Sequence, residues 1–90
     1  MIHEKGLKRI GDACVKIGEA LEKDDEISNQ IKQEVTEILT YLIQHIGYGS
    51  TPPKMIVLAL VKSMKEKSKD SLTLVEHCTV LEEQVDKTYP

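Results

Sequence analysis

Three histidines and two cysteines are the side chains most able to bind a metal or perform nucleophilic chemistry, and their spacing favours neither. They are dispersed along the chain at His3, Cys14, His45, His77 and Cys78. Zinc needs three or four converging ligands, commonly delivered by CxxC or HExxH spacings. The chain contains neither spacing. We therefore expect no metal site, no cofactor and no enzymatic activity.

Both cysteines continue stripes of apolar residues, so we interpret them as small buried hydrophobic residues. Two cysteines are too few for a disulfide framework. The N-terminal residues contain no apolar run typical of a signal peptide, and the longest apolar run, 55–61, has seven residues. These features predict a cytoplasmic protein with free thiols and no membrane insertion. Whether Cys14 and Cys78 approach each other stays open.

The segment GYGSTPPK, 47–54, superficially resembles a phosphate-binding loop. It lacks the GxxxxGK[ST] pattern, and no strand precedes it, so we interpret it as a turn. Gly47 can end a helix in the left-handed conformation. Thr51 can cap the next helix, with Pro52 in the first turn, where proline is tolerated.

A basic cluster lies at Lys62, Lys65, Lys67 and Lys69, interrupted by Glu66, with a local charge of +3. It could contact nucleic acid or an anionic protein surface, or it could complement the dipole at the end of a helix. The chain has a net charge of −3 and a single arginine, and no aromatic residue accompanies these lysines. Arginine and aromatic side chains make most specific nucleic-acid contacts, so this reading is the secondary hypothesis.

The segment 10–23 contains the same heptad twice, IGDACVK followed by IGEALEK. On a helix, Gly11 and Gly18 fall on one edge of the apolar stripe, and Ala13 and Ala20 fall on the other. Each glycine costs a helix about 0.5–1 kcal/mol relative to alanine. Since a missing side chain lets another helix approach closely, the glycines predict a docking groove. Its partner is either a helix of the same chain or a helix of another molecule.

Apolar residues recur every three or four positions in four segments, and no segment alternates as a strand would. The segments are about 3–22, 26–46, 52–67 and 71–87. Three tyrosines are the only aromatic residues, so the core must be aliphatic. We predict an all-α, antiparallel up-and-down four-helix bundle that forms a single domain over 1–90. The runner-up is a three-helix core with the fourth helix packed across it or exchanged in a dimer.

Polar residues before two of these segments predict where the helices begin. Asp24 or Asp25 can cap the second helix, with Glu26 in its first turn, where the helix dipole favours an anion. Asp70 or Ser71 can cap the fourth helix.

The third helix has an unusually wide apolar face. Its apolar residues cover about 200° of the circumference, where a surface helix needs ~100°. Either this helix is contacted on both sides within the bundle, or one side binds a partner. The candidate partner-binding residues, including the two glycines, are Met55, Val57, Leu58, Ala59, Val61, Gly11 and Gly18.

The combination of wide apolar faces and absent catalytic groups predicts a small, non-catalytic protein-binding module. Adaptors, inhibitors, chaperone-like proteins and immunity-type proteins belong to this class. The partner would be another protein or a second copy in a homodimer. The alternative is a small nucleic-acid-binding regulator that uses the Lys62–Lys69 cluster.

Overall fold

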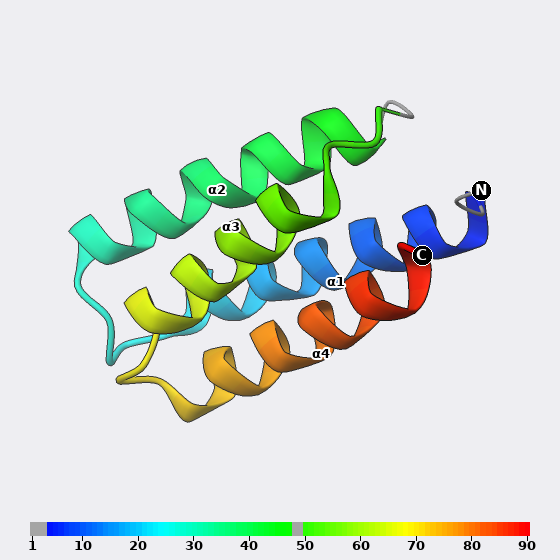
Figure 1. Ribbon diagram of the computed structural model, residues 1–90. Coiled ribbons are helices and arrows are strands. Elements are labelled where there is room, and N and C mark those ends of the chain that lie inside the picture. The colour runs from blue at the N-terminus through cyan, green and yellow to red at the C-terminus, as the bar shows by residue number, and fades with distance from the viewer. Residues whose placement is uncertain (1–3, 48–49) are drawn as a thin grey trace.

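The chain folds into four helices in the computed structural model, which describes residues 4–47 and 50–90. No strand occurs in those two ranges. Successive helices run antiparallel, so that α1 begins and α4 ends at the same end of the molecule (Figure 1). The predicted all-α, up-and-down four-helix bundle is therefore confirmed. The helices are α1, Glu4–Lys23; α2, Asn29–Gly47; α3, Lys54–Lys67; and α4, Leu72–Thr88.

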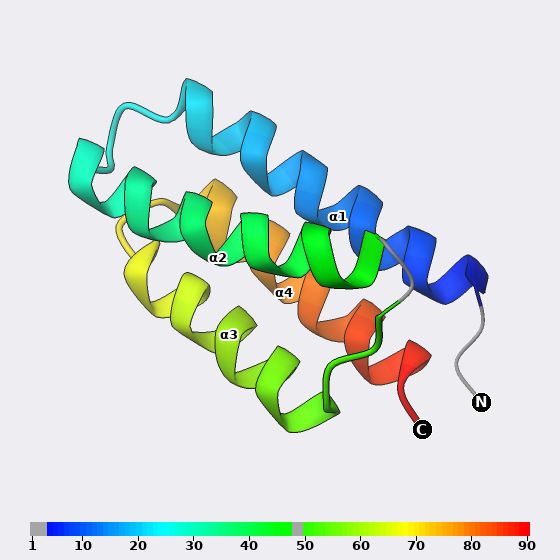
Figure 2. The same cartoon turned by 90° about the horizontal axis from the view of Figure 1, so that it is seen from above.

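Each helix packs against two others around the bundle axis (Figure 2). Helix α1 lies between α2 and α4, and α3 lies between the same two helices. The α2–α3 pair has the sparsest contacts of the four neighbouring pairs. The result is an elongated bundle of 39 × 20 × 19 Å. Within the described ranges, no helix has both the length and the apolar character that a membrane span needs.

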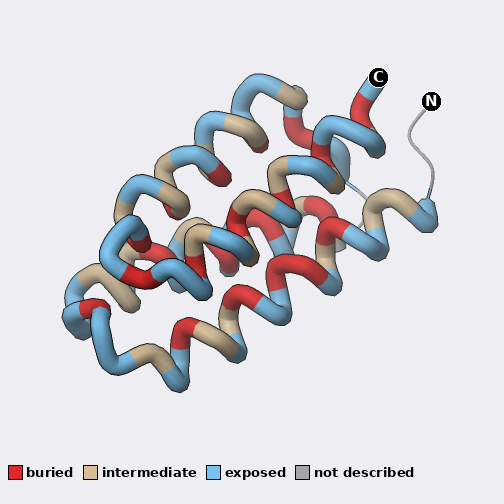
Figure 3. The backbone as a smooth tube through the Cα atoms, turned by 90° about the horizontal axis from the view of Figure 1, so that it is seen from below, coloured by how far each residue is buried: buried red, intermediate tan, exposed pale blue. Residues whose placement is uncertain are grey.

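A single core, aliphatic apart from Tyr89, Met64 and the two cysteines, runs along the bundle axis and draws on all four helices (Figure 3). Most of the periodic apolar residues that predicted the helices become buried, and others, such as Ile31 and Ile38, are partly buried and pack against the core. Burying a side chain such as leucine or isoleucine contributes about 1.5–3 kcal/mol relative to leaving it exposed. The largest fully buried side chains are Ile10, Ile17, Leu42, Met64, Leu74 and Leu81.

The beginning of α2 differs from the prediction, because the helix starts three residues later. Ser28 precedes it, and the Ser28 hydroxyl oxygen accepts a hydrogen bond of 3.2 Å from the amide of Ile31. The prediction that Asp24 or Asp25 caps α2 is therefore wrong. The Asp24 carboxylate instead accepts the amide of Glu26 at 2.8 Å, which holds Glu26 in the loop.

The beginning of α3 also differs, because proline rather than threonine precedes it. Pro53 occupies the N-cap, and no side chain caps the helix. The amides of Ile56 and Val57 donate to the Pro53 carbonyl oxygen at 3.0 and 3.1 Å. The predictions of a Thr51 cap and of Pro52 in the first turn are wrong. Part of the predicted turn, residues 48–49, lies outside the described residues, as does the predicted helix start at residue 3.

Ser71 caps α4, as predicted, and also joins two loops. Its oxygen accepts the amide of Leu74 at 3.3 Å, while its hydroxyl donates to the Asp24 carboxylate at 2.5 Å. This bond ties the α1–α2 loop to the α3–α4 loop. Hydrogen bonds from Ser71 and then from the loop amides hold the pKa of Asp24 below its ordinary value.

Candidate functional site

The candidate partner-binding residues on α3 divide into buried and exposed groups. Val57 and Val61 are 0% exposed, so the structure places them in the core and they cannot form a partner surface. Leu58 is half-buried and packs against the core, whereas Ala59 is exposed. Met55 is 84% exposed. Most of the wide apolar face of α3 is therefore internal, and its exposed part lies near the start of the helix.

The lysines of the basic cluster are largely paired with carboxylates. Three of the four form ion pairs, while Lys62 is exposed. Surface pairs of this kind contribute about 0–1 kcal/mol each, but they reduce the charge available to an anionic partner. Two of them join α3 to its neighbouring helices. The pairs are Lys65 with Glu82 at 3.7 Å, Lys67 with Glu34 at 3.2 Å, and Lys69 with Glu66 at 3.6 Å.

The two glycines of the repeated heptad are not covered by a helix of the same chain. A β-carbon added at Gly11 would meet nothing within 4 Å. One added at Gly18 would meet only the Cδ1 atom of Leu39, at 4.0 Å, which is an ordinary contact. The hypothesis that a helix of the same chain packs closely against both glycines is therefore wrong. The glycine edge of α1 is open.

A different glycine makes the close helix contact that the heptad predicted. A β-carbon at Gly6 would lie 2.6 Å from Cγ2 of Thr88, near the end of α4. No sequence pattern predicted this contact, because Gly6 belongs to no repeat. The facing residue is 82 positions away in the sequence, so only the packed bundle reveals the contact.

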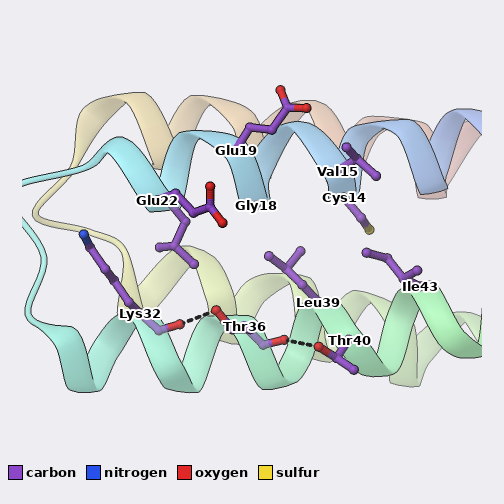
Figure 4. A pocket seen from close by; sticks show the side chains of 11 residues that line it. Cys14, Val15, Gly18, Glu19, Glu22, Lys32, Thr36, Leu39, Thr40 and Ile43 are labelled. Carbon is purple, nitrogen blue, oxygen red and sulfur yellow. Dashed lines mark hydrogen bonds between the residues drawn. The ribbon is translucent and has the colours of Figure 1, made fainter.

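A groove of about 400 Å³ lies between α1 and α2, on the glycine edge of α1 (Figure 4). Cys14 and Gly18 line it from α1, and Leu39 and Ile43 line it from α2. The side chains of Cys14, Leu39 and Ile43 point into the space between the two helices, whereas Glu19 points away from it. Val15 and Ile43 are 48% and 38% exposed. Gly18 on the glycine edge therefore opens onto a largely apolar hollow, whereas Gly11 is not among the residues that line it.

The threonines of this groove offer fewer hydrogen-bonding groups than their residue type suggests. The Thr36 hydroxyl donates to the Lys32 carbonyl oxygen at 2.7 Å. The Thr40 hydroxyl donates to the Thr36 carbonyl oxygen at 2.8 Å. Since both hydroxyl protons are used within α2, the wall of the groove is more apolar than its two threonines suggest. Charged residues, Glu22 and Lys32, lie at one end of the groove.

The thiol on the groove is unsuited to nucleophilic chemistry. Burial, with a smaller contribution from the neighbouring Cys78, raises the pKa of Cys14 to about 12. Burial likewise raises the pKa of Cys78 to about 11. The thiolate is the nucleophile, so both sulfurs stay protonated and inert near neutral pH. Both cysteines are buried, as the stripe pattern predicted.

The histidines do not assemble a reactive site in the part of the chain that the structure describes. There, no three His, Cys, Asp or Glu side chains converge as metal ligands. His45 packs against the ring of Tyr41, with centroids 4.2 Å apart and the planes tilted by 45°. His77 borders a smaller hollow of about 220 Å³ between α1 and α4, where Arg9 and Lys16 lie near Asp12. His3 lies outside the described residues.

Comparisons with known proteins found no relative of this chain. No protein-family model, curated protein or solved structure matches the chain significantly.

Proposed function

We propose that this chain is a non-catalytic protein-binding module whose binding surface is the groove between α1 and α2. The observation that carries the proposal is the coincidence of an apolar hollow of about 400 Å³ with an uncovered glycine edge. Helix-in-groove recognition uses such a surface to hold apolar side chains of a partner helix. Val15 and Ile43 supply exposed apolar contacts beside the hollow.

Gly11 and Gly18, which no contact within the chain explains, support the presence of a partner. Two glycines within one helix cost roughly 1–2 kcal/mol together relative to alanine. Neither makes a contact within the chain that alanine would prevent. A partner helix that packs over Gly11 and Gly18 supplies the missing reason, since larger side chains there would hold it away.

The nucleic-acid alternative gains no comparable support. Its lysines are mostly engaged with carboxylates, and two of the ion pairs brace α3 within the bundle. Titration against generic duplex DNA at low and moderate salt tests this alternative, because phosphate contacts weaken strongly as salt rises. Salt-sensitive binding that is lost in Lys62→Glu would revive it.

Site-specific cross-linking in the native host tests the groove. A photoreactive phenylalanine analogue replaces Val15 beside the groove in one variant and Val80 on α4 in the other. The two valines are a matched pair, being 48% and 49% exposed. We expect a discrete protein adduct from position 15, with the cross-linked peptide mapped by mass spectrometry, and none from position 80. Equal labelling at both positions, or none at position 15, would contradict the proposal.

A further inference from the structure

We propose that the protein that occupies the groove is a second copy of this chain, with α1 packed antiparallel on α1 about a twofold axis at Val15. This inference rests on the proposed function, because it names the partner of the same groove. Three observations carry it: a second seam on α1, the symmetry of that seam, and its charges.

Helix α1 carries two seams with the same spacing. The first seam is the core stripe Leu7, Ile10, Cys14, Ile17 and Leu21, in which Leu7 is partly buried and the others are buried. The residue after each of these forms the second seam, which again alternates steps of three and four, the spacing with which paired helices interlock. No member of the second seam is buried, and Val15 is its one large apolar residue. The second seam is Lys8, Gly11, Val15, Gly18 and Glu22.

The second seam is close to symmetric about Val15. Lys8 and Glu22 each lie seven residues from it, about 10.5 Å along the axis at 1.5 Å per residue. Gly11 and Gly18 lie four and three residues from it. When two copies of α1 run antiparallel about this point, Gly11 of one copy comes nearly level with Gly18 of the other. Close approach at both glycine pairs lets the two Val15 side chains enter the groove mouths beside Ile43.

The charges of Lys8 and Glu22 favour the antiparallel arrangement. In that arrangement Lys8 of each copy lies level with Glu22 of the other, which gives two opposite-charge pairs. A parallel arrangement would instead place lysine beside lysine and glutamate beside glutamate. Over residues 4–47 and 50–90, neither Lys8 nor Glu22 takes part in an ion pair of its own chain. Both charges are therefore available to a second copy, and like charges would disfavour the parallel pair.

Sedimentation equilibrium with charge-swap variants tests this arrangement. We expect the parent chain to reach twice the 10.1 kDa of one copy, reversibly with concentration. Lys8→Glu and Glu22→Lys should each raise the dimer dissociation constant at least tenfold, and the double swap should restore it. A parent chain that is monomeric to millimolar concentration, or a double swap weaker than either single variant, would overturn the inference.

Two controls separate loss of pairing from loss of folding. Val15→Asp should give a monomer with an unchanged helical circular-dichroism spectrum, whereas Val80→Asp should leave the dimer intact. A dimer that survives Val15→Asp would place the contact elsewhere and overturn the inference.

The cross-linking experiment distinguishes this inference from the proposed function. An adduct between two copies of the chain at position 15 supports both. An adduct to a different protein at that position, from a monomeric chain, supports the groove and overturns the second copy. The absence of any adduct at position 15 removes the proposed function itself.

Discussion

At the scale of single residues, glycine has opposite roles at different positions of α1. Gly6, Gly11 and Gly18 all belong to α1, yet a side chain at the first would collide with α4 while the other two positions are open. The repeated heptad predicted close packing within the chain at Gly11 and Gly18, whereas the close contact lies at Gly6. What distinguishes them is the position of Thr88, which no local pattern encodes.

We predict that Gly6→Ala and Gly11→Ala change stability in opposite directions. The first adds a methyl group 2.6 Å from Thr88 Cγ2, and overpacking of this kind costs about 1–3 kcal/mol, only partly offset by the gain in helix propensity. The second adds a methyl group to open space, so the monomer should gain about 0.5–1 kcal/mol. Urea unfolding of dilute protein measures both. Equal effects would contradict the packing described for α1.

The buried thiols give a second prediction at the residue scale. At pH 8, Cys14 in the folded chain should be alkylated at least ~100-fold more slowly than in urea, because burial lowers its thiolate fraction and its accessibility. The raised pKa also means that stability should fall as pH rises from about 9 towards 12, since only the unfolded thiol then ionises. Peptide mass spectrometry after timed alkylation gives the rate. Equal rates in buffer and urea would contradict burial.

At the scale of elements, loop contacts decide where α2 begins. Asp24 is an ordinary helix-capping residue, yet it binds Ser71, which lies 47 positions later. Ser28 caps α2 instead. Periodicity predicted all four helices to within a few residues because burial of their stripes determines them. The choice among neighbouring polar residues as caps could not be predicted, because it depends on contacts between distant loops.

We expect Asp24→Asn to make stability less sensitive to acid. The variant keeps an acceptor for Ser71 but removes the charge, whose pKa is lowered chiefly by the Ser71 hydrogen bond. A lowered pKa contributes stability above the ordinary value of 3.8, and this contribution is lost as pH falls through the lowered pKa. The two proteins should therefore differ in urea stability at pH 7 and converge near pH 2. Asp25→Asn is the control, because it removes a charge from the same loop and leaves the hydrogen bond between Asp24 and Ser71 in place.

Helix α3 shows the limit of an apolar pattern. The pattern gave the width of its apolar face, and Val57 and Met55 both counted as partner candidates. The structure buries the first and exposes the second, because α2 and α4 cover only part of the helix. A helical wheel shows which residues share a face. It does not show which faces have neighbours.

A pair of lysine substitutions tests this division of α3. Val57→Lys places a charge in the core and should cost at least ~3 kcal/mol, enough to lose cooperative unfolding in a bundle of this size. Met55→Lys, at an exposed position, should change stability by less than ~0.5 kcal/mol. Thermal melts followed by circular dichroism distinguish them. A folded Val57→Lys protein with an unchanged melt would contradict the core assignment.

At the scale of the whole molecule, the four faces of the bundle are unequal. The α3–α4 face is bridged by Lys54–Asp86 and Lys65–Glu82 ion pairs. The α1–α2 face carries the open glycine edge, the apolar groove and two exposed aliphatic side chains. The glycines and the repeat are visible in the sequence, but the groove exists only because α2 packs beside α1. This face is the one that we propose binds protein.

The central claim is that the α1–α2 face binds protein. Methyl NMR tests it most directly, because one spectrum reports on every face at once. With the second copy as partner, dilution from millimolar to micromolar concentration should shift the methyl signals of Val15 and Ile43. The signals of Val80 and Met55, on α4 and α3, should stay in place. Shifts confined to Val80 or Met55, with Val15 and Ile43 unchanged, would contradict the account.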